Sequence, residues 1–356
     1  MNIEKLALTL AQGEAYLITS AENCFYFTGF QNGEGVLLIT PKERVYMTDG
    51  RYIEAASAAI TCCTEVLDAP VFTDEIERIC SFEGVKTLYV ETGRITLGFY
   101  EKLRSSLEGR MIEGGDRLEN EINALRSVKS AQEVEKIRKA QSIAEKGFDY
   151  ILTRIKPGVS EIGIARELDF FMLKNGAQAV SFDTIAVTGA KTSMPHGVPG
   201  NEIVKKGDLF LLDFGAVYEG YHSDMTRTVA VGEISGRQAE IYNIVLEAQK
   251  RSLDFLAPGR LCRDADAAAR DYIKEKGFGE KFTHSTGHGV GVEIHEKPNL
   301  SARNEKGALH EGNVVTVEPG IYLPGEFGVR IEDMALITAQ GSENLTGCKK
   351  ELIIIQ

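Results

Sequence analysis

The spacing of hydrophobic residues predicts short strands and helices in the first 110 residues of the chain. Runs rich in β-branched and aromatic residues predict strands, and two further stretches predict helices. The predicted strands are 14–19, 24–30, 35–40, 44–49 and 87–92, and the predicted helices are 74–82 and 99–107. This mixture indicates an α/β domain, and it contains no obvious ligand-binding motif.

A polar, glycine-containing segment over residues 108–120 is typical of a domain boundary. The chain has 356 residues, and at about 100–200 residues per domain this length predicts two domains. We expect an N-terminal domain over residues 1–122 and a C-terminal domain over residues 123–356.

The C-terminal domain begins with a pattern that predicts two helices. Ser130 and Glu133 have the spacing of a capping box, and the helical spacing after them ends before Pro157. A second helix begins after Ser160, which is a favourable N-cap residue, and ends near Gly176.

The same domain contains a weak internal repeat. Pro157 and Gly176 recur 101 residues further along, and one predicted helix lies between the two marks in each copy. Residues 207–215 align with residues 312–320 at an offset of 105, with a carboxylate at the same position of each segment. We therefore expect two related halves that face each other.

Two carboxylates interrupt apolar strands in the first of these halves. Asp213 lies within the apolar run 209–217, and Asp224 directly precedes the returning strand 225–231. A carboxylate in such a strand is costly unless it is paired, hydrogen-bonded or bound to a metal ion. The alternative to a metal ligand is a buried aspartate that caps a turn or pairs with Arg227.

The second half repeats this arrangement. Glu318 follows a β-branched run, and Glu332 and Asp333 lie in another strand-like segment. Two inward carboxylates from each half would repel one another strongly unless cations neutralise them. Four carboxylates with one or two histidines are typical of two divalent ions about 3.5–4 Å apart. Such oxygen-rich sites suit Mn, Mg or Co, and Zn can also bind them.

Residues 282–296, FTHSTGHGVGVEIHE, contain His284, His288 and His295. A helical zinc motif is disfavoured because each of three glycines would cost about 1 kcal/mol in a helix. The glycine spacing also fails to complete a dinucleotide-binding loop. A loop that runs into an extended strand over 291–296 remains. We expect one histidine to bind metal and the others to support it or to contact substrate; the alternative is three polar residues on a surface strand.

Composition narrows the classes of partner. The formal net charge of −12 argues against nucleic acid or an anionic membrane surface as the main partner. No apolar run approaches the roughly 20 residues of a membrane span, and we expect no signal peptide. The six cysteines form no C-x-x-C pair, so we expect reduced thiols in a cytoplasmic protein.

Five motifs follow one another along the chain: MPHGVPG (194–200), LLDFGAVYEGYHSDMTRT (211–228), STGHGVGVEIHE (285–296), VVTVEPGIYLPG (314–325) and GVRIED (328–333). Together they resemble the ordered motifs of the pita-bread metallopeptidases, and within that family those of the proline dipeptidases and aminopeptidase P. The similarity extends through NCFYFTGFQNGEGVLLIT (23–40) and so covers almost the whole chain. It implies an N-terminal creatinase-like α/β domain and a C-terminal pita-bread α+β domain, whose two pseudo-symmetric halves surround an antiparallel sheet.

The resemblance implies five metal ligands, which are Asp213, Asp224, His288, Glu318 and Glu332. By analogy, Asp213 holds one ion, while His288 and Glu318 hold the other. Asp224 and Glu332 would bridge the two ions, and Glu318 would also carry the proton during catalysis.

The resemblance also implies roles for four residues outside this set. His196 would stabilise the substrate and the developing charge, and His295 would assist the tetrahedral intermediate. His284 would lie near the proline side of the scissile bond, and Arg330 would orient a bridging carboxylate and the substrate.

The sequence departs from its relatives at two places. Lys191 and Thr192 stand where relatives usually have Asn-Ser, and His222 stands where they often have Cys. None of the three is an implied ligand, so the departures bear on substrate preference, if on anything.

The implied activity is hydrolysis of Xaa-Pro dipeptides by a hydroxide held between two divalent metal ions, Mn or Co, with Zn as the alternative. The resemblance further implies a homodimer that acts on small peptides, in which one subunit's N-terminal domain would close its partner's site. Three other functions remain: an aminopeptidase P acting on longer Xaa-Pro peptides, a metal-free hydrolase of creatinase type, and a non-catalytic peptidase-like binding module. The five intact ligands argue against the last two.

Overall fold

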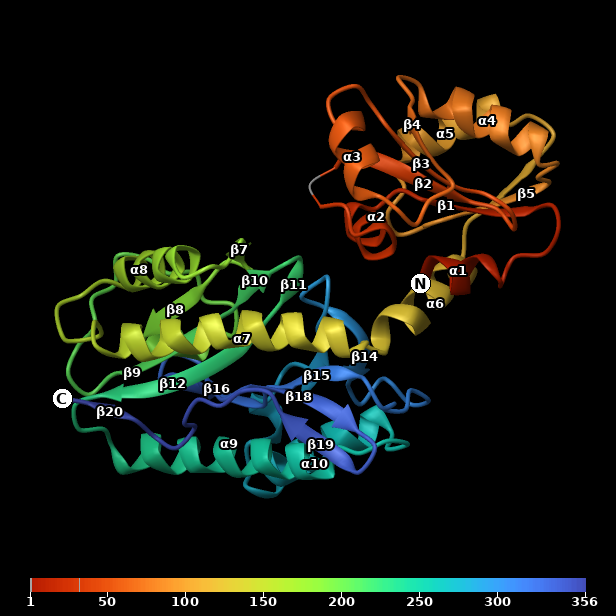
Figure 1. Cartoon of the computed structure of the whole chain (residues 1–356). Helices are drawn as coiled ribbons and strands as arrows, with labels where there is room; N and C mark the ends of the chain where they lie inside the picture. Colours follow the sequence, from red (N-terminus) through yellow and green to blue (C-terminus); the bar gives the residue numbers. More distant parts are fainter. Residues whose placement is uncertain (1, 32) are drawn as a thin grey trace. The chain divides into compact units, whose positions relative to one another are not determined.

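The computed structural model describes residues 2–31 and 33–356 of the chain. It divides into two compact units, Met1–Leu125 and Arg126–Gln356 (Figure 1). None of the described helices is long and apolar enough to cross a membrane.

The first unit is built on one mixed sheet of six strands in the order β4-β3-β2-β1-β5-β6. Its central strand β1 runs antiparallel to β2 and parallel to β5. Apolar side chains from both sheet faces pack under the helices and form two core clusters. The strands are β1 (Glu14–Ile18), β2 (Gly35–Ile39), β3 (Arg44–Thr48), β4 (Glu65–Asp68), β5 (Thr87–Val90) and β6 (Met111–Glu113). The helices are α1 (Asn2–Ala7), α2 (Ala21–Thr28), α3 (Ile53–Ala59), α4 (Phe72–Phe82), α5 (Leu97–Ser106) and α6 (Asp116–Ser127).

The strand predicted over residues 24–30 is wrong, because residues 24–28 belong to helix α2 and Gly29 ends it. Its aromatic residues favour strands by propensity, but tertiary contacts override that preference. The buried carboxylate of Glu91 accepts hydrogen bonds from the backbone of Ser20 and the side chain of Asn23, which fixes the start of the helix. Gly29 ends it with a φ of 73°, a left-handed conformation that glycine adopts without strain.

The second unit begins with two helices, as the sequence predicts, and a second pair follows later. Ser130 and Glu133 form the predicted capping box at the start of the first helix. The first pair covers one side of the strands and the second pair covers the opposite side (Figure 1). The pairs are α7 (Ala131–Leu152) with α8 (Glu161–Lys174), and α9 (Gly236–Phe255) with α10 (Cys262–Glu275).

The strands of this unit confirm the internal repeat. In the first half β9 lies between β8 and β12, and both pairings are antiparallel. In the second half β15 lies in the same way between β13 and β18. These strands are β8 (Ile185–Thr188), β9 (Leu209–Phe214), β12 (Met225–Val231), β13 (Gly287–Gly289), β15 (Val314–Val317) and β18 (Asp333–Thr338). Two helices and an antiparallel three-strand core therefore recur in each half.

Shorter elements complete the unit. β10–β11 and β16–β17 are hairpins in equivalent places of the two halves, and the C-terminal β20 pairs in parallel with β12. The shorter strands are β7 (Ala179–Val180), β10 (Ala216–Tyr218), β11 (Tyr221–His222), β14 (Glu296–Leu300), β16 (Gly320–Leu323), β17 (Phe327–Arg330), β19 (Gly341–Asn344) and β20 (Ile354–Ile355). The 3-10 turns are η1 (Gly189–Ser193) and η2 (Gly279–Lys281).

The strand predicted over residues 291–296 is displaced in the structure. Residues 291–295 form bends, and β14 begins only at Glu296. The reason is that β13 and β14 pair as an antiparallel ribbon with a register shift, so the segment between them must reverse direction. His295 therefore lies on a turn, not within a strand.

Candidate metal centre

The five predicted ligands come from equivalent strand ends in the two halves of the second unit. Asp213 lies near the end of β9, and Glu318 directly follows β15. Asp224 directly precedes β12, and Glu332 directly precedes β18. His288 is the middle residue of β13. All five line one cavity of about 510 Å³.

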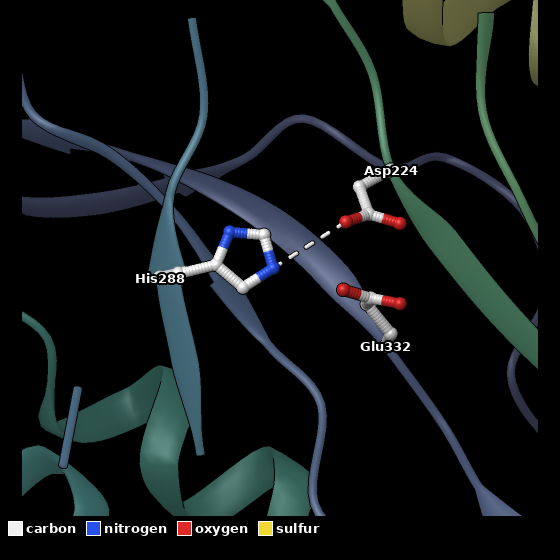
Figure 2. A group of neighbouring side chains, drawn as sticks. All are labelled: Asp224, His288 and Glu332. Carbon is white, nitrogen blue, oxygen red and sulfur yellow. Dashed lines mark ion pairs between the residues drawn. The ribbon is translucent and has the colours of Figure 1, made fainter. Parts of the chain in front are cut away.

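Asp224, His288 and Glu332 point toward one another, His288 from β13 and the two carboxylates from the residues directly before β12 and β18 (Figure 2). One ligand atom from each lies within 4.8 Å of the others. His288 Nε2 is 3.5 Å from Asp224 Oδ2 and 3.3 Å from Glu318 Oε1. The other ring nitrogen, Nδ1, is 3.1 Å from the carbonyl oxygen of Gly289. A histidine held in this way by its Nδ1 proton presents Nε2 to a metal ion.

Three carboxylates of the site each leave one buried oxygen free to bind a cation. Asp213 Oδ1, Asp224 Oδ1 and Glu332 Oε1 are buried without a hydrogen-bond partner. Buried oxygens of this kind are costly when they have no partner. Three such oxygens in one cavity with a histidine fit divalent cations, whose preferred ligands are oxygen and imidazole nitrogen.

The second oxygen of two carboxylates is held by residues behind the site. The Arg330 guanidinium donates to Asp213 Oδ2, and its Nε donates to Thr226 Oγ1 at 3.1 Å. Thr226 in turn donates to Glu332 Oε2 at 2.6 Å. Each carboxylate is thereby oriented so that its free oxygen faces the cavity. Thr226 was not predicted as a site residue, although its position in the buried strand β12, two residues after Asp224, could have indicated it.

Charges within the cluster shift its pKa values in opposite directions. Burial and the neighbouring carboxylates raise the pKa of Asp224 and of Glu332 well above the usual range. Burial also raises the pKa of Glu318, but the hydrogen bond and positive charge of His288 outweigh it and bring that pKa to about 2. Mutual repulsion of buried carboxylates is the physical sign of a site that is completed by positive charge.

The alternative in which Asp213 or Asp224 pairs with Arg227 is wrong. Arg227 Nη2 donates to Asp333 Oδ1 at 2.7 Å, on the side of β12 away from the cavity. Asp333, which directly follows Glu332, is therefore a structural partner and points out of the site.

The three other predicted histidines also line the cavity. The ring of His295 packs edge-on against that of His288, with 4.4 Å between centroids. His284 Nδ1 is 2.8 Å from the carbonyl oxygen of Ser285, and its Nε2 is 2.8 Å from Tyr322 Oη. His196 is exposed at the rim. Burial lowers the pKa of both His284 and His295, so both rings are neutral at neutral pH.

Tyr322 is a further site residue that was not predicted from the sequence. Its hydroxyl accepts a hydrogen bond from Arg330 Nη1 at 2.8 Å and lies against His284. Tyr322 lies four residues after Glu318, in the buried strand β16. This short distance in sequence from a predicted ligand was the signal that could have indicated it.

The glycine before His288 allows β13 to approach β15 closely. A Cβ atom at Gly287 would overlap the backbone carbonyl oxygen of Thr316. Gly287→Ala should lower the free energy of unfolding by about 1–3 kcal/mol, the usual cost of overpacking a core, and should displace His288. Chemical denaturation measures the first effect and metal content the second.

Gly236 provides the matched control, because a Cβ at this first position of α9 would meet no atom within 4 Å. Gly236→Ala should leave stability unchanged or raise it by about 0.5–1 kcal/mol. Equal stability of the two alanine variants would contradict the close approach at Gly287.

Buried carboxylates and a histidine that converge on an open cavity define the class of metal-dependent hydrolases. Residues 135–339 match the model of metallopeptidase family M24, and residues 6–128 match the creatinase/prolidase N-terminal domain. The chain belongs to metallopeptidase family M24 and is a peptidase that uses divalent metal ions.

Individual relatives resemble the chain over its whole length. An Xaa-Pro dipeptidase from Pyrococcus horikoshii is 38% identical over 343 residues, which are 96% of this chain and 94% of that protein. The structure of an Xaa-Pro dipeptidase from Bacillus anthracis has a TM-score of 0.95 and 42% identity, and covers 99% of both chains. The structure of an X-Pro aminopeptidase from Thermotoga maritima has a TM-score of 0.90 and 37% identity, over 98% of this chain and 99% of that one.

Proposed function

We propose that this protein is an Xaa-Pro dipeptidase, which hydrolyses the bond before proline in dipeptides with the help of two divalent metal ions. The observation that carries the proposal is the convergence of Asp224 and Glu332 on His288, in which both carboxylates have a buried oxygen without a hydrogen-bond partner. The full-length similarity to proteins named Xaa-Pro dipeptidase supports the choice of substrate.

Asp213, Asp224, His288, Glu318 and Glu332 would hold the ions. When bound, the ions would polarise the substrate carbonyl and lower the pKa of a water molecule. Four carboxylates and one imidazole favour Mn or Co, with Zn as the alternative.

Glu318 is the proposed proton carrier. Its carboxylate lines the cavity 3.3 Å from His288 Nε2, so it would lie beside the attacking water and could accept a proton from it. It would then deliver that proton to the proline nitrogen as the bond breaks. His295 and His196, on the cavity wall and rim, would donate hydrogen bonds to the oxygen that gains negative charge.

The cavity also offers apolar surface that suits a proline ring. Phe182, Ile185 and Ile294 line it, as does His284. The nitrogen of an Xaa-Pro amide is part of the proline ring and carries no hydrogen, so the scissile amide offers no N–H that would need an acceptor from the protein. Arg330 orients Asp213 and, through Tyr322, His284.

Metal removal and substrate length test the proposal together. Protein stripped with a chelator should lose hydrolysis of Xaa-Pro dipeptides, and added Mn or Co should restore it. Hydrolysis by protein shown to be metal-free would contradict the mechanism. Chromatography of the products measures both outcomes.

Aminopeptidase P activity is the second candidate, favoured by the similarity to the Thermotoga maritima X-Pro aminopeptidase. A dipeptidase should cleave the dipeptide and leave an Xaa-Pro-Yaa tripeptide intact. Release of the first residue from the tripeptide at a comparable rate would favour the aminopeptidase.

The remaining proposals concern compartment and assembly. All six cysteines are free thiols, which supports a reducing, cytoplasmic location. A homodimer is proposed from family resemblance, and light scattering of the purified protein tests it.

A further inference from the structure

The loop that carries His196 has little regular structure of its own. It follows β8, passes through the short turn η1 and extends to Gly200. There the carbonyl oxygen of Gly200 accepts a hydrogen bond from the backbone N–H of Ile162 in α8. Met194 and Val198, on either side of His196, are 58% and 76% exposed. Such a loop needs anchors elsewhere if its histidine is to stay at one place on the rim.

A single buried carboxylate ties the two ends of this loop together. Glu161, the first residue of α8, is completely buried. Its Oε1 accepts a hydrogen bond from the backbone N–H of Thr188 at 2.8 Å, and its Oε2 accepts one from that of Gly200 at 3.0 Å. These two residues flank the segment with His196 near its middle.

Lys191 supplies the positive charge that Glu161 needs. Its Nζ donates to Glu161 Oε2 at 2.7 Å and to Glu202 Oε2 at 3.0 Å. Partial burial lowers the pKa of Lys191, but the bonds to the two glutamates outweigh it and raise that pKa. The ammonium group therefore stays charged, and the carboxylate of Glu161 is neutralised inside the fold.

The neighbouring residue fastens the loop to a second element. Thr192 Oγ1 donates to the carbonyl oxygen of Gly189 at 2.7 Å and accepts from the backbone N–H of Gly328 at 2.8 Å. Gly328 lies in β17, two residues before Arg330, and Arg330 itself donates to the carbonyl oxygen of Pro195 at 3.2 Å. The loop is thus held at its ends by Glu161 and in its middle by β17.

We propose that Lys191 and Glu161 form a clamp that positions His196 for catalysis. The inference rests on the proposed role of His196. Lys191 is a positioning residue, because it reaches the cavity only through the loop that it holds. Its ammonium group binds Glu161 and Glu202. We therefore assign the difference from relatives at position 191 to the geometry of the loop.

The expected effect of Lys191→Met is a fall in kcat/KM for an Xaa-Pro dipeptide of about 10- to 100-fold, the usual result of a small misplacement of a catalytic group. Lys191→Arg should restore most of the activity, since a guanidinium also pairs with a carboxylate. Metal content should stay at the wild-type level in both variants. Lys250→Met, which removes a lysine from an exposed pair 3.9 Å from Glu351, is the matched control and should change nothing.

A double-mutant cycle separates positioning from general stability. In a His196→Ala background, Lys191→Met should change kcat/KM by less than about twofold, because the residue on which it acts is gone. An equal loss in both backgrounds, or a loss of metal, would overturn the proposal.

Hydrogen exchange provides a readout that does not depend on activity. The amides of residues 188–200 should exchange faster in Lys191→Met than in the wild type, while those of α9 should not change. Unchanged exchange in the loop would overturn the clamp. Absence of Xaa-Pro hydrolysis in the wild-type protein would instead refute the proposed function, and the exchange experiment would still test the clamp.

Discussion

Asp224→Asn should abolish Xaa-Pro hydrolysis, with a fall in kcat/KM of more than about 100-fold. Residues that only orient a metal ligand cost about 10- to 100-fold when removed, and a direct ligand contributes more. Asp224 lies 3.5 Å from His288 Nε2 and has a buried oxygen without a partner, so no neighbour can replace its charge. Elemental analysis should show metal loss in parallel with the loss of turnover.

The same variant should be more stable than the wild type when both are metal-free. Burial and nearby carboxylates raise the pKa of Asp224 above its usual 3.8. A carboxyl group whose folded pKa is raised destabilises the fold at high pH, and this penalty disappears as pH falls below the unfolded pKa. The stability difference should therefore be largest near neutral pH and should shrink toward pH 4. Thermal unfolding after chelation measures it.

These two results together distinguish a lost ligand from a damaged fold. An inactive Asp224→Asn protein that is also less stable without metal would indicate misfolding. Full activity with normal metal content would remove Asp224 from the site altogether. Thr64→Ser, a conservative change at an exposed position of the first unit, serves as the neutral reference.

Much of the candidate site could be predicted because its residues break a strong local pattern. Asp213 and Glu318 interrupt apolar strands, and the internal repeat places them at matching positions. Helix ends were also predictable where capping is local, as with Ser130 and Glu133. Patterns of this kind depend only on neighbours in the sequence, so they remain visible without the fold.

The parts that could not be predicted depend on partners far away in the sequence. Helix α2 starts where Glu91, about seventy residues later, accepts hydrogen bonds from Ser20 and Asn23. The bonds that orient Glu332 come from Thr226, more than a hundred residues earlier. Likewise, nothing near Lys191 in the sequence indicates that its charge neutralises Glu161. Such pairings are set by tertiary packing, which overrides local preference.

Arg227→Met should cause the largest loss of stability of any substitution considered for the second unit. Among the residues that the structure describes, Arg227 is the largest fully buried side chain. Besides its pair with Asp333, it donates to the carbonyl oxygens of Cys348 and Lys349, which precede the C-terminal strand β20. Removal of one partner from a buried ion pair costs about 3–5 kcal/mol. The unfolding midpoint should fall by roughly 10 °C, given about 2–4 °C per kcal/mol for a unit of this size.

The pH dependence separates this loss of stability from the gain of stability expected for metal-free Asp224→Asn. Burial raises the pKa of Asp333, but Arg227 and Lys350 outweigh it and lower that pKa below 3.8. A depressed pKa gives stability that is present above the unfolded pKa and lost only at more acid pH. The deficit of Arg227→Met should therefore stay constant from about pH 5 to pH 8, unlike the difference expected for Asp224→Asn.

An exposed arginine supplies the control for size and charge. Arg251 pairs with Glu247 on the surface of α9, with both side chains nearly half exposed, and Arg251→Met should cost less than about 0.5 kcal/mol. Arg227→Lys should remain about as unstable as Arg227→Met, since one ammonium group cannot reach the acceptors on three segments. A midpoint for Arg227→Met close to that of Arg251→Met would show that the buried pair adds nothing. The expected deficit would instead show that β12, which follows Asp224, is held in place from behind the metal centre.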